Sequence, residues 1–362
     1  MNQPESSPRP VVLIVPLDWG LGHATRCIPI IKIFLRLNYT VILAGEGSVK
    51  ILLKEQFPNL QFLDLRGYRV RYSARKWTLP IVLALQIPAI ISAIYNENKW
   101  LKKVIREHQV DLVISDNRYG LYHTKTPCIF ITHQLSIKIP RFPSLEKWLQ
   151  KLNYNYIRQF KTCWVPDTAK APTLAGTLSH PENDPAVPVH YIGALSRLQK
   201  TNESFSEKIL IILSGPEPQR TILEEMLLQQ IHRYKGSVVF VRGLPGHATL
   251  PYVPAHVNIA NHLSAKDLEK QMNSAALVIS RCGYSTIMDI AALQKKSVLI
   301  PTPGQTEQEY LAMHLMEQNF ALCIPQHKLN LSSAIDLAAS FPYQFANYKN
   351  ESIAEDLIRA LI

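Results

Sequence analysis

The sequence contains no uninterrupted apolar run of the ~20 residues that a membrane-spanning helix needs. Its longest apolar stretch, Leu79–Tyr95, is interrupted by two prolines and a glutamine. Residues 1–10 are polar and rich in proline, and they lack the apolar core of a secretory signal peptide. These absences predict a cytoplasmic protein without a transmembrane segment, able to lie peripherally on the inner face of a membrane.

Cysteine is also scarce, and the five cysteines are scattered without a Cys-x-x-Cys pair. This pattern argues against a disulfide framework or a zinc site, and it favours a reducing compartment. The charge is not balanced, because the formal net charge is +11. Basic proteins favour phosphorylated ligands, anionic membranes or nucleic acid. Nucleic acid is the least favoured partner, since no binding motif is present and the basic residues are not interleaved with stacking aromatics.

A basic cluster precedes the longest apolar stretch. Trp77 and the apolar segment 79–94 follow it, and its members are Arg66, Arg69, Arg71, Arg75 and Lys76. Cations attract anionic lipid while tryptophan and aliphatic side chains enter the interface, so the Arg66–Trp77 region is one candidate for membrane-surface docking. The alternative is a solvated loop that leads into a core helix.

The length of 362 residues favours two domains, each with its own hydrophobic core. Apolar runs alternate with helical patterns, which is typical of doubly wound α/β domains. The strands expected in the first half are 11–16, 40–44, 60–65, 111–115, 128–132 and 162–166, and 162–166 is expected to be the last of them. Those expected in the second half are 208–213, 237–241, 257–260, 276–280 and 297–301. The first expected helix follows the first strand and ends at residue 37. The other expected helices cover 80–108, 144–160, 217–231, 265–273, 285–293, 307–319 and 347–362.

The periodicity fades between residues 167 and 202, where prolines and polar residues accumulate. Such a segment predicts a domain junction. We therefore expect an N-terminal Rossmann-like domain at 1–190 and a C-terminal Rossmann-like domain at 191–345. The remaining segment, 346–362, is expected to form a helix that can pack back on the N-terminal domain.

Two glycines and a histidine follow the first expected strand. Gly20 and Gly22 allow the backbone to turn tightly and to approach a ligand. His23 comes at the start of the next helix, where it is either a general base near neutral pH or a helix cap.

Polar side chains also follow two later strands of the same half. Asp116 and Arg118 come after the strand at 111–115, and His133 comes after the strand at 128–132. Ligands bind at the carboxyl ends of such strands, so Asp116 can hold the His23 imidazole in one tautomer and stabilise its protonated form. The alternatives are a turn or cap role for Asp116 and a pocket-wall role for His133.

The second half carries groups suited to a nucleotide sugar. A buried strand ends in Ser280–Gly283, and the helix that follows has hydroxyls in its first turn and free N–H groups that suit a phosphate. Asp289 lies six residues beyond Gly283, where an acid can reach a ribose diol. Ser214–Arg220 is expected to open another helix with Ser214 as its N-cap, and Arg220 would add a cation for a diphosphate.

Taken in order, these segments resemble the GT-B glycosyltransferases, and most closely the MurG-like group, glycosyltransferase family 28. The resemblance is carried by Arg281–Asp289, by Val298-Leu-Ile-Pro-Thr-Pro and by Glu307-Gln-Glu-Tyr310, and the Gly-Leu-Gly-His sequence is similar to the glycine loop of the family. It implies two Rossmann-like domains that face each other across a cleft. It also implies an inverting enzyme that moves N-acetylglucosamine or a related hexose from a UDP-sugar to a hydroxyl acceptor, which can be lipid-linked.

The resemblance also implies roles for particular residues. His23 would be the catalytic base, supported by Asp116, and Asp289 would hold the ribose. The donor side would comprise Ser214, Gly215, Arg220, Leu263, Arg281, Gly283, Ser285, Thr286, Asp289, Gln308 and Glu309. The acceptor side would comprise Gly20, Gly22, Arg118 and His133. No Asp-x-Asp motif follows a strand, so neither a metal nor a resident cofactor is expected. Two alternatives stay open, a same-fold UDP-sugar 2-epimerase and a non-catalytic nucleotide-sugar-binding subunit of a membrane-associated transferase.

Overall fold

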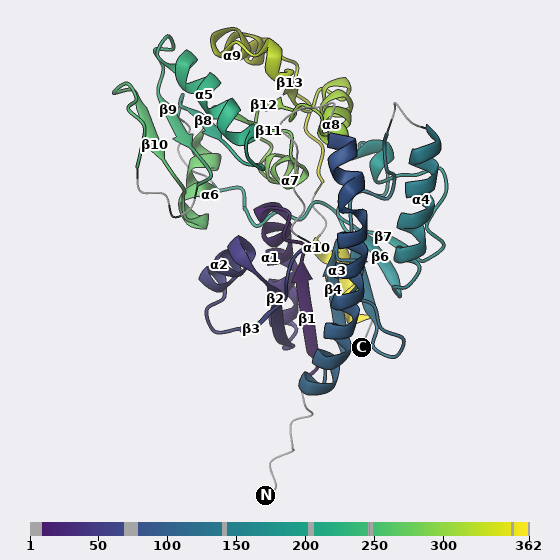
Figure 1. Ribbon diagram of the computed structural model, residues 1–362. Coiled ribbons are helices and arrows are strands. Elements are labelled where there is room, and N and C mark those ends of the chain that lie inside the picture. Colours follow the sequence, from purple (N-terminus) through teal and green to yellow (C-terminus); the bar gives the residue numbers. More distant parts are fainter. Residues whose placement is uncertain are drawn as a thin grey trace, which may run out of the picture.

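A computed structural model describes residues 9–68, 79–139, 143–201, 206–244, 246, 249–348 and 351–360. The described residues form two lobes, each built on a parallel sheet that helices cover (Figure 1). The α/β class with two doubly wound units, expected from the sequence, is confirmed.

The sheet of the first lobe has seven strands in the order β3-β2-β1-β4-β5-β6-β7. These are β1 (Val11–Pro16), β2 (Thr40–Gly45), β3 (Gln61–Asp64), β4 (Leu112–Asp116), β5 (Cys128–Ile131), β6 (Thr162–Val165) and β7 (Val189–Tyr191). The connections contain α1 (Leu21–Arg36), α2 (Gly47–Gln56), α3 (Leu79–His108), α4 (Pro143–Ile157) and the short turn η1 (Gly176–Leu178).

The sheet of the second lobe has six strands in the order β10-β9-β8-β11-β12-β13. These are β8 (Ile209–Ile212), β9 (Val238–Val241), β10 (Val257–Ala260), β11 (Leu277–Arg281), β12 (Ser297–Ile300) and β13 (Leu322–Cys323). The connections contain α5 (Gln219–Ile231), α6 (Ala265–Ser274), α7 (Tyr284–Leu293), α8 (Thr306–Glu317), η2 (Gln326–Lys328) and α9 (Leu331–Ser340), and α10 (Glu351–Arg359) ends the chain.

Each sheet reverses its strand order once. In the first sheet, β2 and β3 lie one after the other on one side of β1, and β4 lies on the other side of β1. The second lobe does the same with β8 and β11. Open α/β sheets bind ligands outside the carboxyl ends of their strands at such a reversal. The starts of α1 and α7 and the end of β4 therefore lie where a ligand is expected.

Apolar side chains on both faces of the central strands build the core. Residues 12–15 of β1 are all inaccessible to solvent, because helices cover both faces of a parallel sheet. This explains why the central strands are continuous apolar runs in the sequence.

The helix α10 returns to the first lobe, where Figure 1 places it beside α1. Arg36 of α1 and Glu355 of α10 form an ion pair on the surface. Ala354 and Ile358 are buried in the apolar cluster that also contains the inner face of α1. The end of the chain thus contributes to the core under the first lobe.

Three sequence expectations need correction. The segment 162–166 is not the last strand of its half, because β7 follows it within the stretch expected to be a junction. Three residues that pair only with β6 leave no periodic signal in the sequence. For the same reason the short strand β13, which pairs with β12, was not predicted. The helices α2 and α9 were not predicted either.

Ser214 is not the N-cap of the following helix, which is the third correction. The helix α5 begins at Gln219 with Pro218 at its N-cap. Gly215 has a φ of +106°, outside the helical region, and Pro216 has no N–H for a cap to accept. Among the described residues, no helix combines the length and the apolarity needed to cross a bilayer.

Removing side-chain volume from α10 should destabilise the whole first lobe. Ile358 is fully buried, so Ile358→Ala is expected to lower the free energy of unfolding by about 2–5 kcal/mol. Ile51 on α2 is 68% exposed and provides a control of the same residue type, for which we expect about 0.5 kcal/mol or less. Urea denaturation followed by tryptophan fluorescence measures both values. Equal losses in the two variants would contradict the packing of α10 on the core.

Candidate active site

The site lies at the carboxyl ends of β1, β4 and β5, where the first lobe meets the second. Pro16 and Asp116 are register partners at the ends of β1 and β4, so the loop after β1 and the end of β4 lie side by side. Asp116 is fully buried, whereas the His23 side chain keeps 16% of its surface exposed. His23 Nδ1 lies 3.1 Å from Asp116 Oδ2. The structure thus brings together the two residues that the sequence nominates for catalysis.

A third residue, Arg26, joins this pair. It lies one helical turn after His23 on the same face of α1 and is only 2% exposed. Its Nε donates to both carboxylate oxygens of Asp116, at 3.0 and 2.9 Å, and its Nη2 also contacts Asp116. Arg26 was not among the residues nominated from the sequence. Its position three residues after His23 was the available signal, but a charged helical residue usually faces solvent.

The Arg26 guanidinium extends the cluster to two histidines. Its Nη2 lies 2.8 Å from His23 Nδ1, and its Nη1 lies 3.2 Å from His133 Nδ1. Because guanidinium can only donate, His133 Nδ1 accepts, and the proton of the neutral His133 ring is on Nε2. That nitrogen lies 2.8 Å from Glu307 Oε1 on α8. A chain of polar contacts therefore crosses from the first lobe to the second.

His133 also makes an apolar contact across the lobes. Its ring stacks on Tyr284 of α7, with centroids 4.0 Å apart and planes 5° from parallel. The Tyr284 hydroxyl donates to the carbonyl oxygen of Pro166 at 2.7 Å. His133 is expected from the sequence to line the acceptor side, and the structure shows it in this interlobe contact. Glu307 was not nominated as a site residue, since only the docking of the lobes reveals its partner.

Burial and charge shift the pKa values of these groups. Burial raises the pKa of Asp116, but the nearby Arg26 and His23 outweigh burial and bring the pKa down to about 2. Burial lowers the pKa of His23, the Arg26 cation lowers it further, and the attraction of Asp116 offsets only part of this. Burial raises the pKa of Glu307, but His133, His23 and Arg26 together outweigh burial, so the net shift is downward. At neutral pH the cluster therefore contains two carboxylates and one guanidinium, with His23 favoured as a neutral ring.

The starts of α1 and α7 touch. Ser285 Oγ donates to the carbonyl oxygen of Gly22 at 2.9 Å. A Cβ at Gly22 would lie 2.6 Å from Ser285 Oγ, so glycine permits this close approach. The glycine loop predicted for the acceptor side and the glycine turn predicted for the donor side thus meet at one point. Thr286 is half-buried in the same helical turn, and Gly20, the N-cap of α1, has a positive φ of 107°.

The predicted ribose acid, Asp289, is half-buried two turns into α7. Ser196 Oγ, in the segment that links the lobes, donates to its Oδ1 at 2.6 Å. Leu263, which was predicted for the donor side, packs against the apolar cluster that contains Ile287 and Met288 of α7. Asp289 is therefore held in one orientation by the protein before any ligand binds.

Gln308 and Glu309 fold back on the loop that precedes α8. Gln308 Oε1 accepts from the backbone N–H of Thr302 at 2.9 Å, and Glu309 Oε1 accepts from the N–H of Gly304 at 3.0 Å. Both side chains stay partly exposed and order the loop after β12. The exposed pair Ser214 and Gly215 follows β8 at the same edge of the sheet.

Three predicted arginines have partners within the protein. Arg118 is fully buried against Glu97 at 2.6 Å, and Arg220 pairs with Glu217 and Glu224. Arg281 Nη1 donates to Gln326 at 2.7 Å, and burial lowers the pKa of Arg281 to about 10. Their predicted roles on the donor side (Arg220 and Arg281) and on the acceptor side (Arg118) stay predictions.

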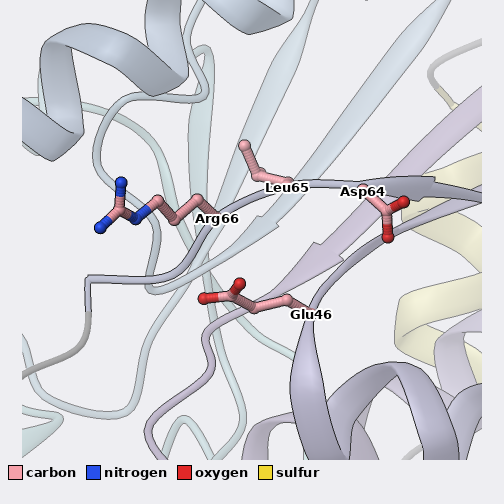
Figure 2. A pocket seen from close by; sticks show the side chains of 4 residues that line it. All are labelled: Glu46, Asp64, Leu65 and Arg66. Carbon is pink, nitrogen blue, oxygen red and sulfur yellow. The ribbon is translucent and has the colours of Figure 1, made fainter.

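A cavity of about 410 Å³ opens on the first lobe, at the ends of β2 and β3. Figure 2 shows the four side chains that line it, Glu46, Asp64, Leu65 and Arg66. The loop after β1 contacts the segment that follows Arg66, since Asp18 Oδ1 accepts from the backbone N–H of Tyr68 at 3.3 Å. The cavity contains two carboxylates and Arg66, which is the first residue of the basic cluster, but none of the residues nominated for catalysis or for binding donor and acceptor.

Within the part of the chain that the structure describes, no group of three or more histidine, cysteine, aspartate or glutamate side chains is arranged to hold a metal ion. Of the Arg66–Trp77 region, residues 69–77 lie outside the described residues. The predicted membrane contact through this region therefore stays a prediction.

Comparisons with known proteins bear on the family and the fold. Residues 259–360 match the glycosyltransferase family 28 C-terminal domain. The UDP-N-acetylglucosamine--N-acetylmuramyl-(pentapeptide) pyrophosphoryl-undecaprenol N-acetylglucosamine transferase of Listeria monocytogenes serotype 4b is 25% identical over 324 residues, which cover 85% of this chain and 84% of the relative.

Solved structures with the same fold include the MurG protein of Acinetobacter baumannii, with a TM-score of 0.54 and 13% identity over 98% of this chain and 94% of that chain. A glycotransferase of kitacinnamycin has a TM-score of 0.63 and 16% identity over 98% of this chain and 96% of that chain. These likenesses confirm the GT-B fold expected from the sequence.

The buried pair of Asp116 and Arg26 should be needed for stability. Asp116→Asn leaves the guanidinium buried without its counter-charge, so we expect a loss of about 3–5 kcal/mol in the free energy of unfolding. Asp64→Asn is a matched control, because Asp64 pairs with Lys50 but is 78% exposed, and it should cost at most about 1 kcal/mol. Urea denaturation of both variants gives the two values, and a small loss for Asp116→Asn would refute the buried pairing.

The same pair predicts a pH dependence. The folded-state pKa of Asp116 is about 2, below the value of about 3.9 for a free aspartate. The stability that this group contributes is therefore present at neutral pH and is lost as the pH falls from about 4 towards 2. Over this pH range the free energy of unfolding, measured by urea denaturation, should fall more steeply for the wild type than for Asp116→Asn.

Proposed function

The chain is a glycosyltransferase with a family 28 C-terminal domain on a GT-B fold, and from this premise we propose that it moves a hexose from a UDP-sugar to a hydroxyl acceptor with inversion at the anomeric carbon. N-acetylglucosamine or a related hexose is the proposed sugar, because the Listeria relative is an N-acetylglucosamine transferase. That relative acts on an undecaprenol-linked substrate, which supports a lipid-linked acceptor. We further propose that the lobes divide near residues 190 and 345.

The observation that carries the proposal is the contact of His23 and Asp116 at 3.1 Å, opposite the start of α7. The His23 ring has an exposed edge, so it can reach an acceptor hydroxyl and take its proton. Asp116 is fully ionised at neutral pH and would stabilise the imidazolium that forms.

The leaving diphosphate would bind at the start of α7. Gly283, the N-cap of this helix, has no atom within 4 Å of the place where a Cβ would stand, so a phosphate can approach the backbone there. The free N–H groups of the first turn would stabilise the charge that develops on the leaving group. Asp289 would accept hydrogen bonds from the ribose hydroxyls, and Gln308 and Glu309 would lie towards the sugar.

Acceptor binding is proposed for the first lobe, beside Gly20 and Gly22. The cavity at Glu46 and Arg66 is one place for the acceptor (Figure 2). Docking on an anionic membrane surface through the Arg66–Trp77 region would bring a lipid-linked acceptor to the site.

Replacing His23 tests the catalytic proposal. His23→Ala should reduce the rate of sugar transfer by ~10²–10⁴-fold, because the reaction loses its general base. His232→Ala, at an exposed position after α5, is a matched control and should keep the wild-type rate. Radiolabelled transfer from UDP-sugars to hydroxyl and lipid-linked acceptors provides the measurement. An unchanged rate in His23→Ala would exclude the general-base role, and formation of an epimer without any acceptor would support a 2-epimerase instead.

Donor binding is tested without any acceptor. A thermal-shift panel of UDP-, GDP- and dTDP-sugars should show the largest rise in melting temperature with the UDP-sugar, because a ligand that binds only the folded state stabilises it. Asp289→Asn should weaken UDP binding by about tenfold or more, since hydrogen bonds to a carboxylate are lost. Asp336→Asn, exposed on α9, should bind UDP like the wild type. Binding of the donor with no transfer to any acceptor would favour a non-catalytic subunit.

A further inference from the structure

Arg26 occupies the centre of the polar cluster, and the mechanism above gives it no task. One planar guanidinium contacts Asp116 through Nε and Nη2, His23 through Nη2 and His133 through Nη1. The side chain is 2% exposed, so it has no room to turn to solvent in place of these contacts. The planar fork of arginine fits such an arrangement, whereas a lysine ammonium would not span it.

The contacts of His23 Nδ1 are chemically exclusive. Arg26 Nη2 is a permanent donor at 2.8 Å, and the Asp116 carboxylate is a permanent acceptor at 3.1 Å. A neutral imidazole can either accept at Nδ1 from the guanidinium or donate from Nδ1 to the carboxylate, but it cannot do both. The guanidinium is the nearer partner. Asp116, in turn, already accepts from Arg26 at both oxygens.

We propose that Arg26 is a positioning residue that sets the tautomer and the proton affinity of His23, and that in the ligand-free enzyme it holds His23 neutral with the proton on Nε2. Nδ1 then accepts from Arg26, and Asp116 acts on His23 mainly by fixing the guanidinium. Every polar contact of the His23 ring within the described residues is made through Nδ1, so Nε2 is the nitrogen left towards the exposed edge.

This inference rests on the proposed function and changes how the base is used. A ring that carries its proton on Nε2 cannot accept the proton of an acceptor hydroxyl at that atom. For transfer, Nδ1 must exchange Arg26 for Asp116 as its partner, so that the ring holds its proton on Nδ1 and its lone pair on Nε2. The proton moves through water, because Nε2 releases one proton to solvent and Nδ1 takes one up. The resting enzyme would therefore not activate a stray water against the donor.

The titratable groups around His23 come from every element packed there. They are Arg26 and Cys27 on α1, Asp116 at the end of β4, His133 after β5, Tyr284 on α7 and Glu307 on α8. Asp116 is paired with Arg26, and Glu307 faces His133, so the two carboxylates are each already engaged. Burial and the Arg26 charge lower the pKa of His23, in agreement with a ring that stays neutral beside the guanidinium.

The test is an NMR titration of the full-length protein labelled at its 12 histidines. Long-range proton–nitrogen spectra distinguish the two tautomers, and the signals of His23 are those absent from His23→Gln. In the wild type we expect the Nε2–H tautomer and a His23 pKa below the ordinary value of about 6.5. A wild-type ring with its proton on Nδ1 at neutral pH would overturn the proposal.

Variants of Arg26 complete the test. In Arg26→Gln, His23 should donate to Asp116 from Nδ1, and its pKa should rise by about one unit or more, since a nearby cation is replaced by a neutral group. Arg26→Lys keeps a cation to pair with Asp116, so this variant should stay folded. It loses the planar guanidinium that donates to His23, so it should shift the tautomer in the same direction. Arg36→Gln removes an exposed arginine of the same helix and should change neither quantity. An unchanged His23 tautomer and pKa in both Arg26 variants would refute the proposal.

The NMR experiment needs no substrate, so its outcome is independent of the proposed reaction. If transfer is detected, the acidic limb of the kcat/KM profile should move to higher pH in Arg26→Gln, whereas a purely structural role would lower the plateau without moving the limb. Wild-type protein that shows the expected tautomer but no transfer to any acceptor would refute the proposed function and leave the assignment of Arg26 intact. A limb that stays in place, with the His23 pKa raised in the NMR titration, would refute the exchange of partners during catalysis.

Discussion

The arrangement of the site depends on one buried ion pair, Arg26 with Asp116. Taking both charges out of water is costly, and their attraction repays the cost only when the geometry is good and the remaining hydrogen-bonding groups are satisfied. Here both carboxylate oxygens accept from the guanidinium, and the guanidinium also reaches two histidines. The pair joins the start of α1 to the end of β4, which are the two parts of the first lobe that meet at the reversal of strand order. It thereby fixes where His23 can lie.

The same cluster couples the two lobes. His133 connects the ion pair to Glu307, and its ring rests on Tyr284. Ser285 donates to the backbone beside the glycine loop. A ligand at the start of α7 would therefore lie next to the groups that set the state of His23, so donor binding and the readiness of the base would not be independent.

The sequence allowed prediction of the elements whose signal is local. Central strands such as β1 are continuous apolar runs because both faces of a parallel sheet are covered, and His23 and Asp116 were found because strand ends in such sheets share one edge. β7 and β13 could not be predicted, since pairing with a neighbour defines them. Arg26 lies in the same motif as His23, but only the fold shows that this charged residue faces inward. Glu307 required the docking of the lobes.

The partners of the basic residues also became known only from the fold. A net charge of +11 suggests cations free to meet a diphosphate, yet Arg118, Arg220 and Arg281 each have a partner within the protein. Arg118 and Arg220 are paired with carboxylates, and a guanidinium paired in this way adds little net attraction for a phosphate. Arg281 instead donates to the neutral amide of Gln326. Under the proposed function, the backbone N–H groups at the start of α7 are donors to the leaving group. Their position is set by the helix itself and needs no side chain to reorganise, which is the property that makes such donors effective in a transition state.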